Sequence, residues 1–308
     1  MRRAQRLAAN LPPQWDRRVR ELGKVLLDYR GARATALRGP LFSVLGRFSP
    51  LLAARLGRAT VIVDSHDDEV GRTIFVTGDY ERRYMDAALT FLRTSEPSRE
   101  IGPTFVDVGA NIGTSTLDAL LEFGFERAIC FEPDPHNYRL LRLNLVLNEL
   151  EDRVTTFPLA LSDASGERAL ARSARNSGDS HLVADLERQP GRDQVVEVRT
   201  LDELVSEGTL KPESVGVLWI DAQGHEPYIL AGARHSLDAG FPVVAEYWPH
   251  GLGESGLELL ERLVAELFTS VIDLRRMGEV ESELAAAELG RLRAKYRRRE
   301  FTDLLLLR

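Results

Sequence analysis

Phe105-Val-Asp-Val-Gly-Ala-Asn-Ile-Gly-Thr114 is the stretch of sequence that decides the fold. Its apolar first half predicts a short β-strand, and the glycines predict a turn that leads into a helix. In such a turn Gly109 and Gly113 let the backbone approach a ligand closely, and the helix directs its N-terminal amides at that ligand. The order strand, Gly-x-Asn-x-Gly, helix is typical of a nucleotide-type cofactor loop.

This loop differs from the dinucleotide fingerprint Gly-x-Gly-x-x-Gly. Asn111 occupies the position of the second glycine, and the last glycine comes one residue early. A pyrophosphate would fit poorly there. The sequence therefore disfavours a nicotinamide-dependent oxidoreductase.

A second signal lies in Cys130-Phe-Glu-Pro-Asp134, where Glu132 ends the next predicted strand. An acid at that strand end can accept hydrogen bonds from both hydroxyl groups of a ribose. Together with the glycine loop, it predicts an adenosine-containing cofactor.

Around this core, short β-rich runs alternate with helical stretches. Such alternation implies right-handed βαβ units and an α/β fold with a mostly parallel sheet and helices on both faces. The longer stretch 162–211 holds two alternating runs and predicts an inserted hairpin over the active face. A charged helix is expected over 281–297, followed by a last strand that inserts late into the sheet. The predicted core strands are Thr104–Val108, Ala128–Glu132, Val154–Leu159, Val215–Asp221, Val243–Tyr247, Ser270–Leu274 and Phe301–Leu307.

The N-terminal part has a different pattern. Residues 1–58 read as helices punctuated by proline and glycine. Short strands are expected at Thr60–Asp64 and Arg72–Thr77, and a helix over Tyr80–Leu92. The chain of 308 residues thus divides into a basic helical extension (1–58), a lead-in segment (59–100) and the main domain (101–308).

Charge is distributed unevenly. Residues 1–58 contain 13 of the 40 Lys and Arg residues but 3 of the 47 Asp and Glu residues, a net charge of +10 against −17 for the remainder. A basic segment can bind nucleic acid, an anionic membrane surface, an acidic substrate or the acidic body of its own chain. The apolar run Leu41–Leu56 could likewise lie on a membrane, cover a substrate or pack against the main domain.

Cys130 is the only cysteine, so the chain has no intramolecular disulfide. It lies in a predicted core strand, where a small buried hydrophobic side chain is expected. The N-terminus lacks the apolar region of a secretory signal, and no run approaches the roughly 20 apolar residues of a transmembrane helix. We expect a cytoplasmic protein without a transmembrane segment.

Several motifs in fixed order resemble the FkbM-type methyltransferases, which use S-adenosylmethionine and have a seven-stranded Rossmann-like fold. The resemblance covers roughly residues 78–247 and leaves the basic segment outside. It rests on Gly78-Asp-Tyr-Glu81, Asp107-Val-Gly-Ala-Asn-Ile-Gly113, Phe131-Glu-Pro-Asp134, Asn144 with Asn148, Thr200-Leu-Asp202 and Ile220-Asp-Ala-Gln-Gly-His-Glu226.

The resemblance implies S-adenosylmethionine as the cofactor and assigns residues to its parts. Glu132 would bind the ribose, and Asp163 would face the adenine amino group. The residues implied to surround the methionyl part are Asp107, Gly109, Asn111 and Gly113.

The chain also departs from the family pattern. Trp219 stands where the family usually has lysine, and Gln223 stands where it usually has glutamate. The missing acid at Gln223 argues against a carboxylate-rich metal site. The histidines other than His225 do not show the spacing of metal ligands, so no metal is predicted.

Catalytic candidates cluster after the fourth core strand. Asp221, His225 and Glu226 would lie beside the methyl donor, because ligands bind at the carboxyl edge of such a sheet. His225 is the candidate general base, since its ordinary pKa near 6.5 suits deprotonation at neutral pH; a purely structural role in the turn is the alternative. Glu246 and His181 are candidate acceptor-binding residues.

The predicted function is an S-adenosylmethionine-dependent O-methyltransferase acting on a hydroxyl of a small molecule, such as a sugar or a secondary metabolite. One alternative is a nucleic-acid methyltransferase that holds phosphates with its basic arm, although no nucleic-acid partner is expected. Another is a methyltransferase-like binding protein with reduced turnover. The N-terminal segment is left open as an acceptor lid, a homodimer contact or a docking surface.

Overall fold

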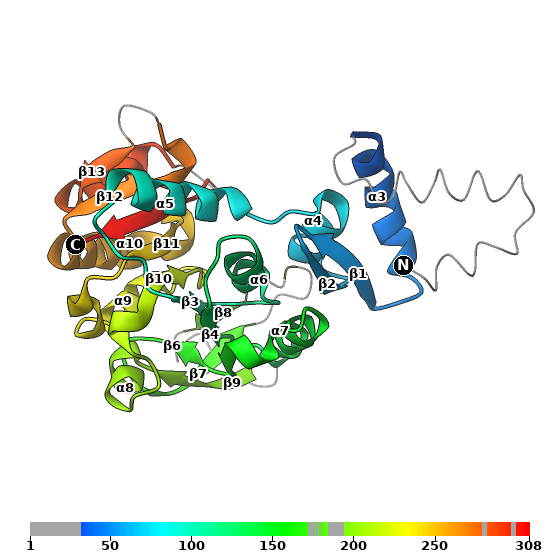
Figure 1. Ribbon diagram of the computed structural model, residues 1–308, viewed down its shortest axis with the longest axis horizontal. Helices are drawn as coiled ribbons and strands as arrows, with labels where there is room; N and C mark the ends of the chain where they lie inside the picture. Colours follow the sequence, from blue (N-terminus) through cyan, green and yellow to red (C-terminus); the bar gives the residue numbers. More distant parts are fainter. Residues whose placement is uncertain are drawn as a thin grey trace, which may run out of the picture.

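The computed structural model describes residues 32–171, 176, 178, 180–183, 194–278, 282–296 and 300–308. The predictions made for residues 1–31 lie outside the described residues. Within them the chain forms one large sheet, a smaller sheet beside it and an N-terminal hairpin (Figure 1).

The large sheet confirms the expected Rossmann-like α/β fold. Its strand order is β13-β12-β14-β11-β10-β3-β4-β5. The run from β11 to β5 is parallel, and β14 inserts antiparallel between β11 and β12, as the late strand was expected to do. An extra strand, β13, extends the expected seven at one edge. The bounds are β3 Thr104–Val108, β4 Arg127–Phe131, β5 Val154–Phe157, β10 Val215–Ile220, β11 Val243–Tyr247, β12 Ser270–Asp273, β13 Glu283–Ala285 and β14 Thr302–Leu307.

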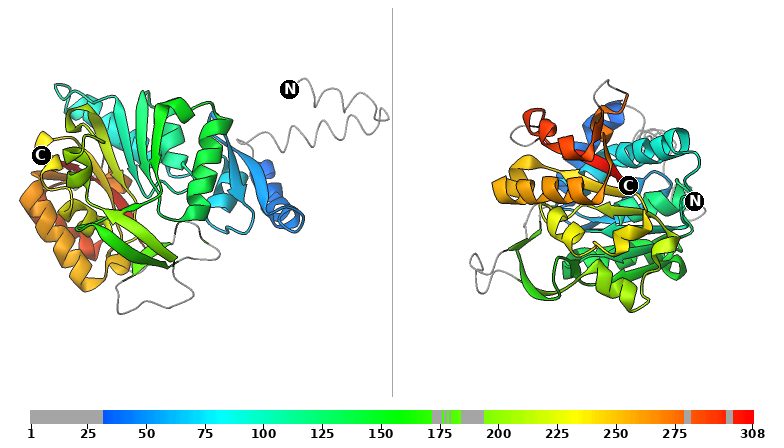
Figure 2. Two further views of the ribbon diagram at one scale, coloured as in Figure 1. Left: turned by 90° about the horizontal axis from the view of Figure 1, so that it is seen from below. Right: turned by 90° about the vertical axis from the view of Figure 1, so that its left-hand side faces the viewer.

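Helices cover both faces of this sheet and create two apolar cores (Figure 2). Strands β3, β10, β11 and β14 are buried along their whole length, which explains why they read as continuous apolar runs. One face packs against α5 (Arg82–Ser95), α6 (Thr114–Leu121) and α7 (Pro135–Leu147). The other packs against α8 (Leu201–Ser206), α9 (Glu226–Ala231) and α10 (Pro249–Leu267). Short 3-10 turns lie at Glu151–Arg153, Pro212–Ser214, Ser236–Ala239 and Leu274–Arg276.

The stretch 162–211 contains the inserted strands that the sequence predicted. They pair antiparallel within the smaller sheet, whose order is β6-β9-β7-β8. The bounds are β6 Ala160–Leu161, β7 Gly166–Ala171, β8 His181–Val183 and β9 Gln194–Arg199.

The N-terminal segment departs from the predicted helical extension. Helix α3 (Ala32–Leu45) is present, but Leu51–Leu56 forms a strand, β1, that pairs antiparallel with β2 (Ala59–Asp64). Exposed and buried residues alternate along β1, which is the period of a half-buried strand. The strand pair therefore crosses the boundary that we predicted after residue 58.

The strand predicted at Arg72–Thr77 is also wrong, because Val70–Thr77 is a helix, α4. Capping outweighs the β-branched composition. The carboxylate of Asp67 accepts hydrogen bonds from the first amides of the segment, those of Glu69 and Val70, and Gly78 ends the helix in the left-handed conformation at φ 74°.

The charged α-helix expected over 281–297 is replaced, in its described part, by β13 and a 3-10 helix over Ala286–Ala294. The buried side chains of that 3-10 helix are Ala286, Leu289 and Leu292. They recur every three residues, which matches the three residues per turn of a 3-10 helix better than the 3.6 of an α-helix.

Asn144 and Asn148 connect α7 to the N-terminal hairpin through side-chain hydrogen bonds. The side-chain amide of Asn144 accepts from the Ile62 amide at 2.7 Å and donates to the carbonyls of Ile62 and Ile112. Asn148 makes the same two-way contact with the Thr60 backbone. The two side chains thus satisfy the free edge of β2, and Asn144 also holds the cofactor loop.

None of the helices in the described part combines the length and apolar character that crossing a bilayer requires.

Replacing Asn144 with alanine should lower the free energy of unfolding by about 2 kcal/mol or more, since buried backbone groups of Ile62 and Ile112 lose their partner. Urea unfolding measures this. The control is Val146→Ala on the same helix, whose side chain is 55% exposed and whose loss should cost less than about 0.5 kcal/mol. Equal effects of the two substitutions would show that the Asn144 hydrogen bonds contribute nothing to stability.

Candidate active site

Two adjoining hollows open at the carboxyl edge of the parallel strands. We call the first the inner pocket; among its lining residues are Glu132, Pro133, Leu161, His181, His225 and Ile229. The second, the outer cleft, has a volume of about 830 Å³ and is lined by Tyr80, Glu81, Arg83, Asp107, Glu246 and Trp248, among others. Gly109, Asn111, Gly178, Asp221 and Gln223 line both hollows. The two spaces therefore meet at the cofactor loop and at the loop that follows β10.

The glycines of the cofactor loop are required by the protein's own packing. A Cβ at Gly109, where φ is +85°, would lie 1.9 Å from the carbonyl oxygen of Asp221. At Gly113, with φ +92°, it would lie 2.8 Å from Leu141 Cδ1. The sequence predicted close approach to a ligand at these positions; the structure adds a close approach of loop to loop.

Asn111 occupies the tip of this loop with φ 50°, the left-handed region that asparagine tolerates better than most residues. Its side-chain Oδ1 is buried, and among the described residues it has no hydrogen-bond partner. A buried acceptor without a donor is costly. The atom lines both hollows and is free to accept a hydrogen bond from a ligand there.

Glu132 lies at the end of β4, almost fully buried. Its two carboxylate oxygens accept from the backbone amides of Asn111 at 2.8 Å and Asp134 at 2.7 Å. Each oxygen keeps a further lone pair for a hydroxyl donor, which fits the predicted contact with a ribose. Burial raises the pKa of Glu132 to about 8, although the two amide hydrogen bonds oppose the shift.

Asp107 is the acid inside the same strand end. It is 1% exposed, and its Oδ2 accepts from the hydroxyl of Thr116 at 2.5 Å. Burial raises its pKa to about 7. It lines the outer cleft beside the cofactor loop, where the resemblance puts the methionyl part.

Asp163, predicted to face the adenine, is exposed and is not among the residues that line the inner pocket. Its Oδ1 accepts from the hydroxyl of Ser162 at 2.9 Å, and Ser162 Oγ also contacts His225 Nε2 at 2.8 Å. The role of Asp163 toward the adenine stays a prediction.

This chain of contacts fixes the proton on His225. A hydroxyl has one hydrogen, and the Asp163 carboxylate needs it, so Ser162 Oγ must accept from His225 Nε2–H. Burial lowers the pKa of His225 to about 4, which leaves the ring neutral near pH 7. Its free acceptor is therefore Nδ1. The ring stacks on Tyr228 at 4.8 Å and lines the inner pocket.

Glu226, the third catalytic candidate, lies behind this loop. It is 1% exposed, and its Oε1 accepts from the amides of Ala222 at 2.9 Å and Gly224 at 3.2 Å. It lines neither hollow. The geometry supports a positioning role for Glu226, since its carboxylate holds the loop that carries Asp221 and His225.

Asp221 and Glu246 face the outer cleft and are joined by Gln223. The amide of Gln223 donates to Asp221 Oδ1 at 2.9 Å and to Glu246 Oε2 at 3.4 Å. Burial, followed by the charges of Asp221 and other nearby acids, raises the pKa of Glu246 well above its usual range. The glutamine thus bridges two carboxyl groups that would otherwise repel each other.

Sequence reasoning missed two acids at this edge. Glu81 lines the cleft from the start of α5, and Asp303 lies opposite Glu246 in the β11–β14 register. The signal for Glu81 was available, because it belongs to the Gly78-Asp-Tyr-Glu81 motif. No sequence signal pointed to Asp303, because its place opposite Glu246 follows from the strand order alone.

The remaining predicted residues divide between core and pocket. Trp219, unusual for the family at its position, is 5% exposed in the sheet core. Cys130 is buried, as predicted. His181 lines the inner pocket rather than the outer cleft. The described residues contain no group of three or more His, Cys, Asp or Glu side chains arranged to hold a metal ion.

The parallel sheet, with the glycine loop and Glu132 at its carboxyl edge, defines the class of protein, a Rossmann-like α/β protein. The sequence model of the FkbM methyltransferase domain matches residues 107–278, and the chain belongs to this family. It is an S-adenosylmethionine-dependent methyltransferase. Asn111 Oδ1, which has no hydrogen-bond partner in the part of the chain that the structure describes, and the lone pairs of Glu132 fit that cofactor.

Several known proteins are similar to this chain. The 2-O-methyltransferase NoeI of Sinorhizobium fredii is 30% identical over 182 residues, covering 54% of this chain and 72% of the relative. The methyltransferase sdnD of Sordaria araneosa is 27% identical over 165 residues, covering 54% and 56%. A crystal structure of the methyltransferase FkbM from Methylobacillus flagellatus is 16% identical with a TM-score of 0.42, covering 87% of this chain and 58% of that one.

Replacing Glu132 with alanine should abolish measurable S-adenosylmethionine binding. It should also lower stability, because the amides of Asn111 and Asp134 lose their acceptor at about 1–3 kcal/mol for each group. Calorimetric titration and thermal unfolding measure the two effects. Glu151→Ala, an exposed acid, is the control. Unchanged cofactor affinity in Glu132→Ala would refute the ribose assignment.

Stability should fall as the pH rises from about 5 to about 8. The folded pKa values of Asp107 (about 7), Glu226 (about 7) and Glu132 (about 8) lie above those of the unfolded chain. In this window the folded state binds more protons, so raising the pH favours unfolding. Urea unfolding at several pH values tests the sign, and Glu132→Gln should flatten the slope. A free energy of unfolding that rises over the window would contradict the assignment.

Proposed function

We propose that the enzyme transfers the methyl group of S-adenosylmethionine to a hydroxyl group of a small molecule, such as a sugar or a secondary metabolite. The observation that carries the proposal is that the inner pocket and the outer cleft share the cofactor loop and the Asp221 loop. A methyl donor in the first space therefore presents its reactive carbon to an acceptor in the second. Methyl transfer needs mainly this alignment and the exclusion of water.

The residues divide between the two substrates. Glu132, Asn111, Gly109 and Gly113 would hold the cofactor, with Asp107 at its methionyl end. Bound there, the cofactor supplies an electrophilic methyl carbon on a sulfonium. Asp221 and Glu246 would hold the acceptor at the mouth of the cleft, where Trp248 adds an aromatic wall.

The hydroxyl acceptor is supported by the relatives and by the cleft. One relative is described as a 2-O-methyltransferase. The cleft wall is rich in carboxyl groups with raised pKa values, and such groups both donate to and accept from hydroxyls.

The test is a panel of sugars, phenols, aliphatic alcohols, amines and nucleic acids, incubated with S-adenosylmethionine labelled in the methyl group. We expect transfer to hydroxyl compounds and none to RNA or DNA. Glu132→Ala, which should not bind the cofactor, is the negative control. Label found only in nucleic acid would favour the basic arm as the substrate-binding element, and label found only in amines would overturn the hydroxyl assignment.

The catalytic role of His225 stays a prediction with a clear measurement. If His225 Nδ1 is the general base, His225→Ala should keep cofactor affinity and slow transfer by roughly 10²–10⁴-fold. If the ring instead serves the Ser162 contact and the inner pocket, the variant should lose cofactor affinity while the rate at saturating cofactor changes little. The control is His235→Ala, because His235 lines neither hollow.

A further inference from the structure

We propose that Glu81 is the general base of methyl transfer: its carboxylate contacts the acceptor in the outer cleft and takes the proton of the group that is methylated. The inference deepens the function proposed above and rests on it, because it assumes that the acceptor occupies this cleft.

Glu81 has a position in the outer cleft that suits contact with the acceptor. Glu81 immediately precedes α5 and lines the outer cleft together with Tyr80 and Arg83. Its backbone is left-handed, with φ 57° and ψ 8°, a region that glutamate occupies at an energetic cost. Such strain persists where the surrounding structure imposes it, most often at functional sites.

The Glu81 carboxylate is available to a substrate, whereas three other carboxylates at this edge have donors. Asp107 accepts from Thr116, and Glu132 and Glu226 accept from backbone amides. By contrast, no donor among the described residues hydrogen-bonds to the Glu81 carboxylate. Its oxygens are therefore free to accept from a substrate.

The proton affinity of the Glu81 carboxylate also suits a general base. Burial, followed by the charge of Asp221, raises the pKa of Glu81 to about 8, and the guanidinium of Arg83 opposes the shift. A base works best when its pKa lies near the working pH. The titratable and charged groups that interact with it are Asp79, Tyr80, Arg83, Asp221, Glu246 and Asp303.

The proposed step balances without another reactant. The acceptor O–H bond breaks, and its proton passes to the Glu81 carboxylate. The O–CH3 bond forms as the methyl–sulfur bond of S-adenosylmethionine breaks, and the electron pair of that bond stays on sulfur. The carboxyl group then returns its proton to solvent through the open cleft.

Glu81 and His225 are distinguishable as bases. The Nε2 proton of His225 is donated to Ser162, and the ring lines the inner pocket but not the outer cleft. Burial lowers the pKa of His225 to about 4, so a base role there would give a rate that rises with pH near 4. A base role for Glu81 gives a rise near 8.

The experiment compares single-turnover rates of the wild-type enzyme, Glu81→Gln and Glu81→Asp between pH 5 and pH 9.5, using labelled S-adenosylmethionine and the best acceptor from the panel. The wild-type rate should rise to a plateau above about pH 8. Glu81→Gln should be roughly 10²–10⁴-fold slower at pH 8, lack this rise and keep its cofactor affinity. Glu81→Asp retains a carboxylate and should recover the rise at a lower rate.

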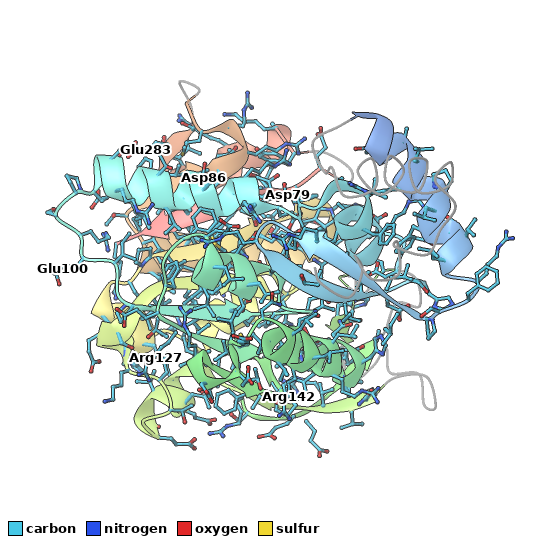
Figure 3. All side chains as sticks on the ribbon, turned by 45° about the vertical axis from the view of Figure 1, so that its right-hand side comes forward. Asp79, Asp86, Glu100, Arg127, Arg142 and Glu283 are labelled. Atoms are coloured by element: carbon cyan, nitrogen blue, oxygen red, sulfur yellow. The ribbon has the colours of Figure 1, made fainter. Side chains whose placement is uncertain are left out.

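Asp86→Asn is the matched control, because it removes a charge from the exposed face of the same helix (Figure 3). It should leave the rate and the pH profile unchanged. Glutamine adopts the left-handed backbone at a cost similar to that of glutamate, and thermal unfolding verifies that the variant folds; if it does not, the pH profile of Glu81→Asp alone decides.

A Glu81→Gln rate close to wild type would overturn the proposal, and so would a rise near pH 8 that survives the substitution. A rate that is flat from pH 5 to pH 9.5, and that falls in His225→Ala but not in Glu81→Gln, would transfer the role to His225. If the panel yields an amine acceptor only, the hydroxyl assignment fails, while the pH profile of Glu81→Gln on that amine still decides the role of Glu81.

Discussion

The backbone contact between Gly109 and Asp221 is the constraint on which the catalytic edge depends. Only a residue without a side chain fits at position 109, because a Cβ would lie 1.9 Å from the Asp221 carbonyl oxygen. The contact brings the turns after β3 and β10 together, so the same two loops line both hollows. In the proposed function, donor and acceptor therefore meet where the two strands end.

Polar contacts also fix the opposite wall of the outer cleft, at the start of α5. Arg82, next to Glu81, makes a two-pronged hydrogen bond to the buried Asp118, with Nε at 3.1 Å and Nη2 at 2.6 Å from its oxygens. The turn of the N-terminal hairpin leaves room for this guanidinium, since a Cβ at Gly57 would lie 1.8 Å from Arg82 Nη2. The start of α5 is thus held against α6, which gives a group at position 81 a defined place in the cleft.

The parts of the fold and site that could be predicted are those encoded by local pattern. The alternation of apolar runs and helical stretches indicated the parallel sheet, and the glycine loop together with Glu132 indicated an adenosine-containing cofactor. What failed was decided by capping or by three-residue spacing, as in α4 and the 3-10 helix over Ala286–Ala294. Asp303 was missed for another reason. It reaches Glu246 only through strand order and register, which no local pattern encodes.

The acidic cleft also bears on how the reaction is driven. Burial, followed by the mutual repulsion of neighbouring carboxyl groups, raises the pKa of each, so these groups cannot all be ionised. A cationic donor reduces that repulsion, yet its positive charge disappears as the methyl group leaves. Ground-state attraction alone would therefore slow the reaction. A proton that moves onto Glu81 in the same step restores the lost positive charge, so the net charge of the cleft is the same before and after transfer. On this argument the acidic wall stabilises the products as well as the reactants, and that balance requires the proton acceptor to belong to the wall itself.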